Sequence, residues 1–349
     1  MSKFAIIFAV ALAIFAPIQA FAQTAAVVLM YHRFGEAKYP STNIDLVQFD
    51  AHLTYLRNNR FNVVSLADIA AALKSGMALP PKTVAITIDD AYASVVREAW
   101  PRLKRAGYPF TVFVATAAVD NRETGIMSWD DVRALAAGGA TIGAHSHTHA
   151  HYPSLSATGV AADIAKMKDR FKTELGVVPE MFAFPYGEAG DADMALVAEA
   201  GFKIAFGQHS GAAYNEGNVF YVPRFALNEN YGRMDRFALA VSVNPLRAVN
   251  IVPANPVLAA NPPRIEFDVI DPPRGLADVS CFTGGGDKLP TSVNGARVEI
   301  VPAAAYPVGR ARANCTLRSA GQWYWFGYQM IAGGVSEGIE VHGRYPLAR

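Results

Sequence analysis

Short apolar segments alternate with helix-type segments between about residues 25 and 227, and this pattern limits the fold more than any other feature. Such alternation is typical of parallel strands with helices packed outside them. Seven units in about 200 residues favour a (β/α) barrel over an open sheet, although periodicity alone does not separate the two. Either fold places its site beyond the C-terminal ends of the strands. The strand-type runs are residues 26–31, 61–64, 84–88, 110–114, 141–143, 181–184 and 204–206.

The character of the chain changes after residue 244. Prolines punctuate residues 245–263, which we interpret as a linker between a barrel at 23–244 and a second domain at 264–349. The second domain contains β-type runs and predicts a small β-sandwich. Its two cysteines, Cys281 and Cys315, are the only ones in the chain, and we expect them to form a disulfide.

The N-terminus predicts export. Lys3 precedes an apolar run that is shorter than a membrane span, and Ala20, Phe21 and Ala22 form a small-x-small cleavage pattern. We therefore expect a signal peptide at residues 1–22, a periplasmic or secreted protein, and no stable membrane insertion after cleavage; a short N-terminal anchor is the alternative. Without Lys3 the basic and acidic residues balance at 30 each, which argues against a nucleic-acid partner.

Two acidic residues and a cluster of histidines follow predicted strands. Asp89 and Asp90 come directly after residues 84–88, and four of the eight histidines lie between His145 and His151. His145 and His149 have the i, i+4 spacing that would place both imidazoles on one face of a helical turn. With Asp90 they would offer a carboxylate and two imidazoles, a set that suits zinc, cobalt, nickel or iron. A helix cap at Asp89–Asp90 and an idle histidine-rich loop are the alternatives.

These motifs, followed by Phe184-Pro185-Tyr186-Gly187, resemble the polysaccharide deacetylases of carbohydrate esterase family 4, the NodB-homology family. The resemblance covers about residues 26–227 and implies a distorted (β/α)7 barrel. It implies a divalent metal, with zinc as the first candidate, on Asp90, His145 and His149, and it makes Asp89 the general base. It also implies that the main-chain N–H of Tyr186 stabilises the oxyanion. Residues 29–34 and 127–130 resemble the branch that deacetylates poly-β-1,6-N-acetylglucosamine.

The chain departs from the family pattern in two places. Ala183 or Phe184 stands where most members carry an arginine that pairs with the base, and we expect Arg224 to replace it; a surface charge is the alternative. No late histidine motif supplies the general acid. His32, at the end of the first strand, is our first candidate and His209 the second; a structural histidine is the alternative for each.

Aromatic residues suggest where a sugar binds. We predict that Trp129, Pro185, Tyr186 and His209 contact substrate, with plain packing as the alternative for Trp129. In the C-terminal run at residues 322–330, alternation would place Trp323 and Trp325 on one face and Tyr324, Phe326 and Tyr328 on the other, and one of the two faces must fill the sandwich core.

The function that follows is an exported, metal-dependent hydrolase that removes N-acetyl groups from an N-acetylglucosamine polymer and releases acetate. A peptidoglycan or chitin-oligomer deacetylase is the near alternative. An inactive glycan-binding protein on the same fold is the alternative from another class.

Overall fold

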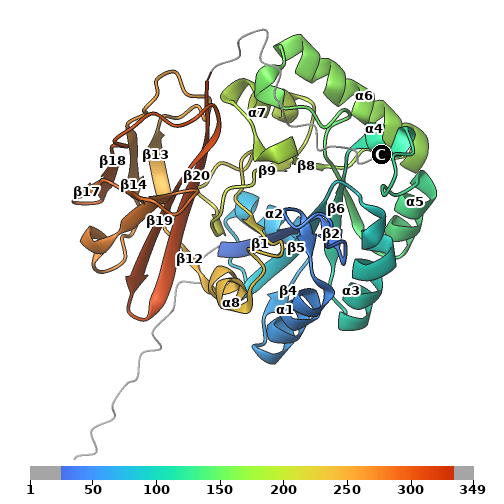
Figure 1. The fold of residues 1–349 in the computed structure, drawn as a ribbon, viewed down its shortest axis with the longest axis horizontal. Helices are drawn as coiled ribbons and strands as arrows, with labels where there is room; N and C mark the ends of the chain where they lie inside the picture. Colours follow the sequence, from blue (N-terminus) through green and yellow to red (C-terminus); the bar gives the residue numbers. More distant parts are fainter. Residues whose placement is uncertain (1–24, 334–349) are drawn as a thin grey trace, which may run out of the picture.

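The computed structural model describes residues 25–333, and these form a curled α/β unit beside a strand-rich unit (Figure 1). The predicted α/β class with an added C-terminal β region is confirmed. No helix within this part of the chain is both long and apolar enough to cross a membrane. The predicted signal peptide lies outside the described residues.

One curled sheet forms the α/β unit, and all its pairings except that of β10 are parallel. Its order is β10-β1-β5-β6-β7-β8-β9, with β4 and β11 paired at the side. The central strand β5 is buried on both faces, as its β-branched run predicts. The bounds are β1 (Ala25–Tyr31), β4 (Asn62–Val63), β5 (Thr83–Asp89), β6 (Phe110–Val114), β7 (Thr141–Ala144), β8 (Met181–Ala183), β9 (Ile204–Phe206), β10 (Ala213–Tyr214) and β11 (Phe225–Ala226).

A short segment at residues 222–226 nearly closes the sheet. Val222 bridges to Phe206 of β9, and a few residues later β11 pairs with β1. The two ends of the curled sheet are therefore joined by this segment. Arg224 lies in its middle, between the first and last parallel strands.

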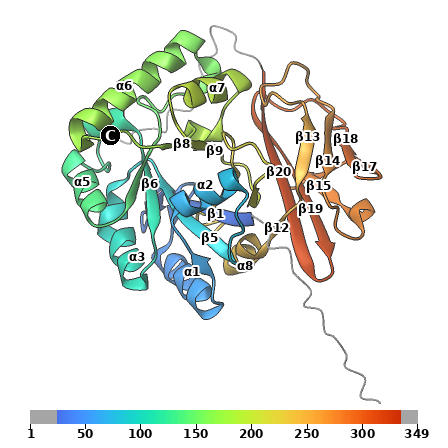
Figure 2. The same cartoon turned by 180° about the vertical axis from the view of Figure 1, so that it is seen from behind.

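Helices cover the outside of the sheet (Figure 2). Ser65 and Ser128 cap two of them, and Gly107 ends a third in the left-handed conformation. The bounds are α1 (Leu46–Asn58), α2 (Leu66–Ser75), α3 (Trp100–Ala106), α4 (Thr116–Asp120), α5 (Trp129–Ala137), α6 (Ala157–Leu175), α7 (Asp191–Glu199) and α8 (Met234–Ser242). Before α3, residues Val95–Ala99 form a π-helical turn, and β2 (Arg33–Phe34) pairs with β3 (Asn43–Ile44).

Two sheets pack face to face in the C-terminal unit and share one apolar core. The five-stranded sheet contains β12 (Asn244–Pro245), β20 (Gln322–Ala332), β19 (Gly309–Ser319), β15 (Ser280–Thr283) and β16 (Lys288–Leu289). The four-stranded sheet contains β13 (Ala248–Val252), β14 (Ile265–Val269), β18 (Arg297–Ile300) and β17 (Thr291–Asn294). β13 and the second residue of β12 thus lie inside residues 245–263, where we predicted a linker. Pro245 is tolerated in β12 because β12 is an edge strand.

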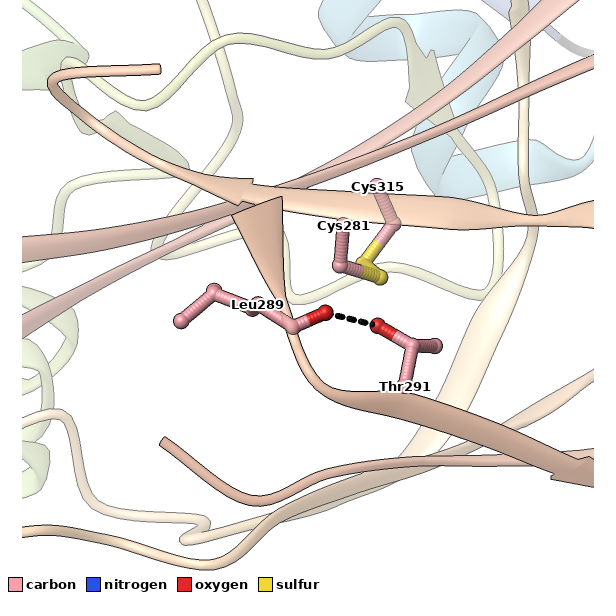
Figure 3. The surroundings of a disulfide bond; sticks show 4 residues. All are labelled: Cys281, Leu289, Thr291 and Cys315. Carbon is pink, nitrogen blue, oxygen red and sulfur yellow. Dashed lines mark hydrogen bonds between the residues drawn. A yellow bond between two sulfur atoms is a disulfide. The ribbon is translucent and has the colours of Figure 1, made fainter. Parts of the chain in front are cut away.

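The predicted disulfide joins two strands of the sandwich (Figure 3). Cys281 of β15 and Cys315 of β19 are directly paired in the register, and both are fully buried. The hydroxyl of Thr291 donates to the carbonyl of Leu289 beside them. The cross-link therefore lies in the sandwich core, away from the barrel.

Strand β20 lies between the two units in both views (Figures 1 and 2). On one face, Phe326 and Tyr328 belong to the sandwich core, which decides between the two faces that the alternation left open. On the other, Trp325 packs edge-on against Phe225 of the barrel, with ring centres 5.4 Å apart. A side chain at Gly327 would meet the carbonyl oxygen of Ser210 at 2.0 Å, so glycine is required at this close approach.

Candidate active site

Asp89 and Asp90 diverge at the C-terminal end of β5. Asp89 is the last strand residue and is fully buried. Asp90 has a φ of 72°, in the left-handed region, so the chain turns sharply directly after the strand. The two neighbouring carboxylates therefore have different surroundings, which allows them to have different roles.

The histidine segment is an irregular loop, so the predicted helical turn is wrong. Positive φ values at Ser146 and His149 bend the chain, and the Ser146 hydroxyl accepts the main-chain N–H of His149 at 2.9 Å. Asp163 of α6 stabilises this loop conformation through hydrogen bonds. Its carboxylate accepts four hydrogen bonds, from the N–H groups of His147 and Thr148 and from the hydroxyls of Thr148 and Tyr152. The two N–H groups are main-chain donors that a helix would have paired internally.

The loop nevertheless brings both imidazoles to Asp90. The Nε2 atoms of His145 and His149 lie 3.2 and 3.1 Å from one Asp90 oxygen, Oδ1. One ligand atom from each residue falls within 4.8 Å of the others, and this is the one such group of three found in residues 25–333.

The donor chemistry of this cluster fits a cation. The Nδ1–H of His145 donates to the carbonyl oxygen of Ala183 at 2.7 Å, which leaves Nε2 with a lone pair. That Nε2 atom and Asp90 Oδ1 are both buried without a hydrogen-bond partner. Two buried acceptors that face each other repel unless a cation lies between them. A carboxylate with two imidazoles is a ligand set that zinc and related transition metals accept.

Asp89 is held by Arg224 across the sheet. Both Nη atoms of Arg224 donate to the two Asp89 oxygens at 2.8 Å, and neither side chain is exposed. The guanidinium also donates to the carbonyl of Gly207 and the hydroxyl of Thr87. Burial acts to raise the pKa of Asp89, but the charge of Arg224 and its hydrogen bonds act against it, and the pKa stays below its usual range. Asp89 is thus an ionised carboxylate in a fixed orientation.

The two candidate general acids lie in different places. His32 is only partly exposed, and burial lowers its pKa, although the charges of Asp90 and Asp89 act to raise it. His209 is buried, and burial together with Arg312 and Arg224 lowers its pKa to about 3. Its ring lies against Tyr221, with centres 4.7 Å apart, and its Nδ1 is buried without a partner. The carboxylates of Asp90 and Asp89 thus act on His32, whereas the His209 ring packs against Tyr221.

The turn at Pro185–Gly187 forms one wall of the site. Tyr186 has a φ of 59°, which is uncommon for a bulky side chain. Its ring lies 4.6 Å from that of His149 and stacks on His151 at 3.9 Å. Pro185 itself is buried within the turn. The Tyr186 ring thus borders the metal-ligand cluster directly.

Trp129 takes the packing role rather than the sugar-binding one. It is almost completely buried in the barrel core, with its ring 5.9 Å from Phe171. Its Nε1–H donates to Asp120 at 2.8 Å. Trp129 lies on the buried face of α5 with Val132 and Leu135, so its indole packs in the barrel core.

Two acidic residues that sequence reasoning missed organise the site. Asp163 interrupts the apolar stripe formed on α6 by Val160, Ile164 and Met167, and this misplaced charge was the available signal. Glu188 Oε2 accepts the Nδ1–H of His151 at 2.6 Å. Nothing in the local sequence distinguishes Glu188 from a surface carboxylate.

The chain is similar to known proteins in sequence. Residues 76–205 match the family described as polysaccharide deacetylase. A poly-β-1,6-N-acetyl-D-glucosamine N-deacetylase of Escherichia coli K12 is 27% identical over 219 residues, which cover 50% of this chain and only 32% of that protein. The enzyme of the same name from Staphylococcus aureus is 22% identical over 234 residues, covering 60% of this chain and 80% of that one.

A solved structure supports the fold. The structure of IcaB from Ammonifex degensii superposes with a TM-score of 0.56 and 27% identity, covering 62% of this chain and 97% of that chain. The similarity therefore covers a region about as long as the barrel.

Proposed function

This chain carries a polysaccharide deacetylase domain, and we propose that it is an exported, metal-dependent enzyme that hydrolyses the N-acetyl groups of an N-acetylglucosamine polymer. The observation that carries the proposal is the pair of buried, unpartnered acceptors, Asp90 Oδ1 and His145 Nε2, next to the Asp89–Arg224 pair. Such an arrangement is costly to fold and suits hydrolysis.

We assign Asp90, His145 and His149 as the ligands of a divalent transition metal, zinc first, with cobalt, nickel or iron as the alternatives. When bound, such a metal acts as a Lewis acid that polarises the acetamide carbonyl and makes water a better nucleophile. The Ala183 carbonyl orients His145 by accepting its Nδ1–H, so that Nε2 faces the cluster.

Asp89 is the proposed general base. Its carboxylate accepts the proton of the attacking water, and Arg224 keeps it ionised and fixed in direction. The C–N bond of the acetamide then breaks, acetate leaves, and the sugar keeps a free amine. Tyr186 remains our predicted oxyanion donor through its main-chain N–H, and its position against His149 supports this role.

His32 is the proposed general acid, which supplies a proton to the departing nitrogen. His32→Ala is expected to lower kcat for acetate release about 100-fold, the lower end of the range for general acid catalysis. His209→Ala should lower it much less, because the His209 ring packs against Tyr221 rather than against the metal-ligand cluster. Initial rates at saturating substrate measure both variants, and a larger loss in His209→Ala would reverse the assignment.

The relatives' substrate makes a β-1,6-linked N-acetylglucosamine polymer the first candidate, with peptidoglycan and chitin oligomers next. The test is acetate release from oligomers of all three linkages by purified, metal-loaded protein. We expect the β-1,6-linked oligomer to give the highest kcat/KM. A protein that binds oligomers, releases no acetate from any and holds no metal would favour the glycan-binding alternative.

A further inference from the structure

Strands β19 and β20 of the C-terminal sandwich reach the turn that borders the proposed active site. We propose that the sandwich is part of the catalytic unit and that Gln329 of β20 is a positioning residue, which holds the Tyr186 turn in its working conformation. This inference rests on the proposed function and adds a role for the second domain.

Gln329 is fully buried and directs its amide at the turn. Its Nε2 donates to the carbonyl oxygen of Gly187 at 2.6 Å and to that of Tyr186 at 3.4 Å. Arg312 of β19 donates to the other end of the amide, Oε1, at 3.0 Å. Because arginine is only a donor, this contact fixes which end of the amide is oxygen, and therefore directs the N–H groups toward the turn.

Arg310 of β19 makes a second connection. Its Nη1 donates to the Tyr186 carbonyl at 3.3 Å, and its Nε lies 3.4 Å from Glu188. Glu188 in turn contacts His151, whose ring stacks on Tyr186. The turn is thus held from the sandwich on one side and from the histidine loop on the other.

The turn needs such support because its conformation is unfavourable by itself. Tyr186 has a left-handed φ, which persists only where the surroundings determine it. Gly187 leaves no room for adjustment, because a side chain there would lie 2.3 Å from the main-chain nitrogen of Gln208. Since the Tyr186 ring lies against His149, a shift of the turn would reach the metal-ligand cluster.

The neighbouring residue offers a matched control. Tyr328 is buried on the same strand and points to the opposite face, where its hydroxyl contacts the carbonyls of Pro253 and Ala254 at 2.6 and 3.0 Å. Gln329→Leu and Tyr328→Phe therefore each remove a donor to two main-chain carbonyls. Only the first removes a contact with the turn.

The experiment compares the two variants by hydrogen exchange and by kinetics. In Gln329→Leu we expect the amides of residues 184–190 to exchange at least tenfold faster and kcat for acetate release to fall about tenfold, with KM and metal content unchanged. Tyr328→Phe should leave all of these at the wild-type values. If Gln329→Leu does not fold, Arg310→Met takes its place, because Arg310 is half-exposed. In Arg310→Met we expect a smaller change, about threefold, in the exchange rate of residues 184–190 and in kcat.

Equal exchange of residues 184–190 in both variants would overturn the proposal, as would faster exchange with unchanged kcat. The exchange measurement needs no substrate. A wild-type protein that releases no acetate would therefore refute the proposed function, while the exchange result would still decide whether β20 holds the turn.

Discussion

The variant His149→Ala is expected to lose the bound metal and to lower kcat/KM for acetate release about 1,000-fold. His149 supplies one of three ligand atoms within 4.8 Å of one another, and its loss leaves only Asp90 and His145. The metal contributes several kcal/mol of transition-state stabilisation, and each 1.36 kcal/mol is tenfold in rate. The measurements are metal content per chain by elemental analysis and acetate release before and after dialysis against a chelator.

His147 provides the control in the same loop. Its Nδ1 contacts the Thr116 hydroxyl at 2.8 Å, away from the ligand cluster. His147→Ala should keep one metal per chain and most of the activity. If His149→Ala retains both its metal and its turnover while His147→Ala loses them, the ligand set proposed here is wrong.

The second large effect is expected from Arg224→Met, which leaves the Asp89 carboxylate buried without its partner. Removing one member of a buried ion pair lowers the free energy of unfolding by about 3–5 kcal/mol. Burial then raises the pKa of Asp89, so less of it is the ionised base, and acetate release should fall about 100-fold. Urea unfolding gives the stability, and initial rates give the activity.

Two further variants distinguish the effect of breaking the Asp89–Arg224 ion pair from the effect of removing an arginine elsewhere. Adding Asp89→Asn to Arg224→Met should recover part of the lost stability, because no buried charge remains, but none of the activity. Arg236 likewise lies over an aromatic ring, that of Phe225, but it donates to the main-chain carbonyl of Tyr231 rather than to a carboxylate. Arg236→Met should therefore cost much less in both measurements. Unchanged turnover in Arg224→Met would show that Asp89 does not need this partner.

The strands and caps could be predicted because their signals are local. The β-branched run of β5 and the serine caps of α2 and α5 act within a few residues of one another. The same locality explains the wrong prediction at residues 145–149. The i, i+4 spacing suggests a helical turn, but the carboxylate of Asp163, a distant residue on α6, takes the loop's main-chain donors.

Trp129 and Arg224 show a similar limit. An aromatic residue at the start of a helix has the same local sequence whether it faces solvent or, as here, the barrel core. An arginine in a short strand-like segment reads equally well as a surface charge. Its pairing with Asp89 depends on residues 222–226 joining β9 to β1, a contact across 135 positions of sequence.

By itself, the sequence determined the alternation of strands and helices, the place of Asp89, Asp90, His145 and His149 at strand ends, and the pairing of the only two cysteines. Each depends on side-chain chemistry and on periodicity over a few residues. Only the tertiary structure decided that Arg224 neutralises Asp89, that Asp163 shapes the histidine loop, and that Gln329 contacts the Tyr186 turn. Buried polar groups must find partners wherever the fold brings them, and that choice is made by packing between distant segments.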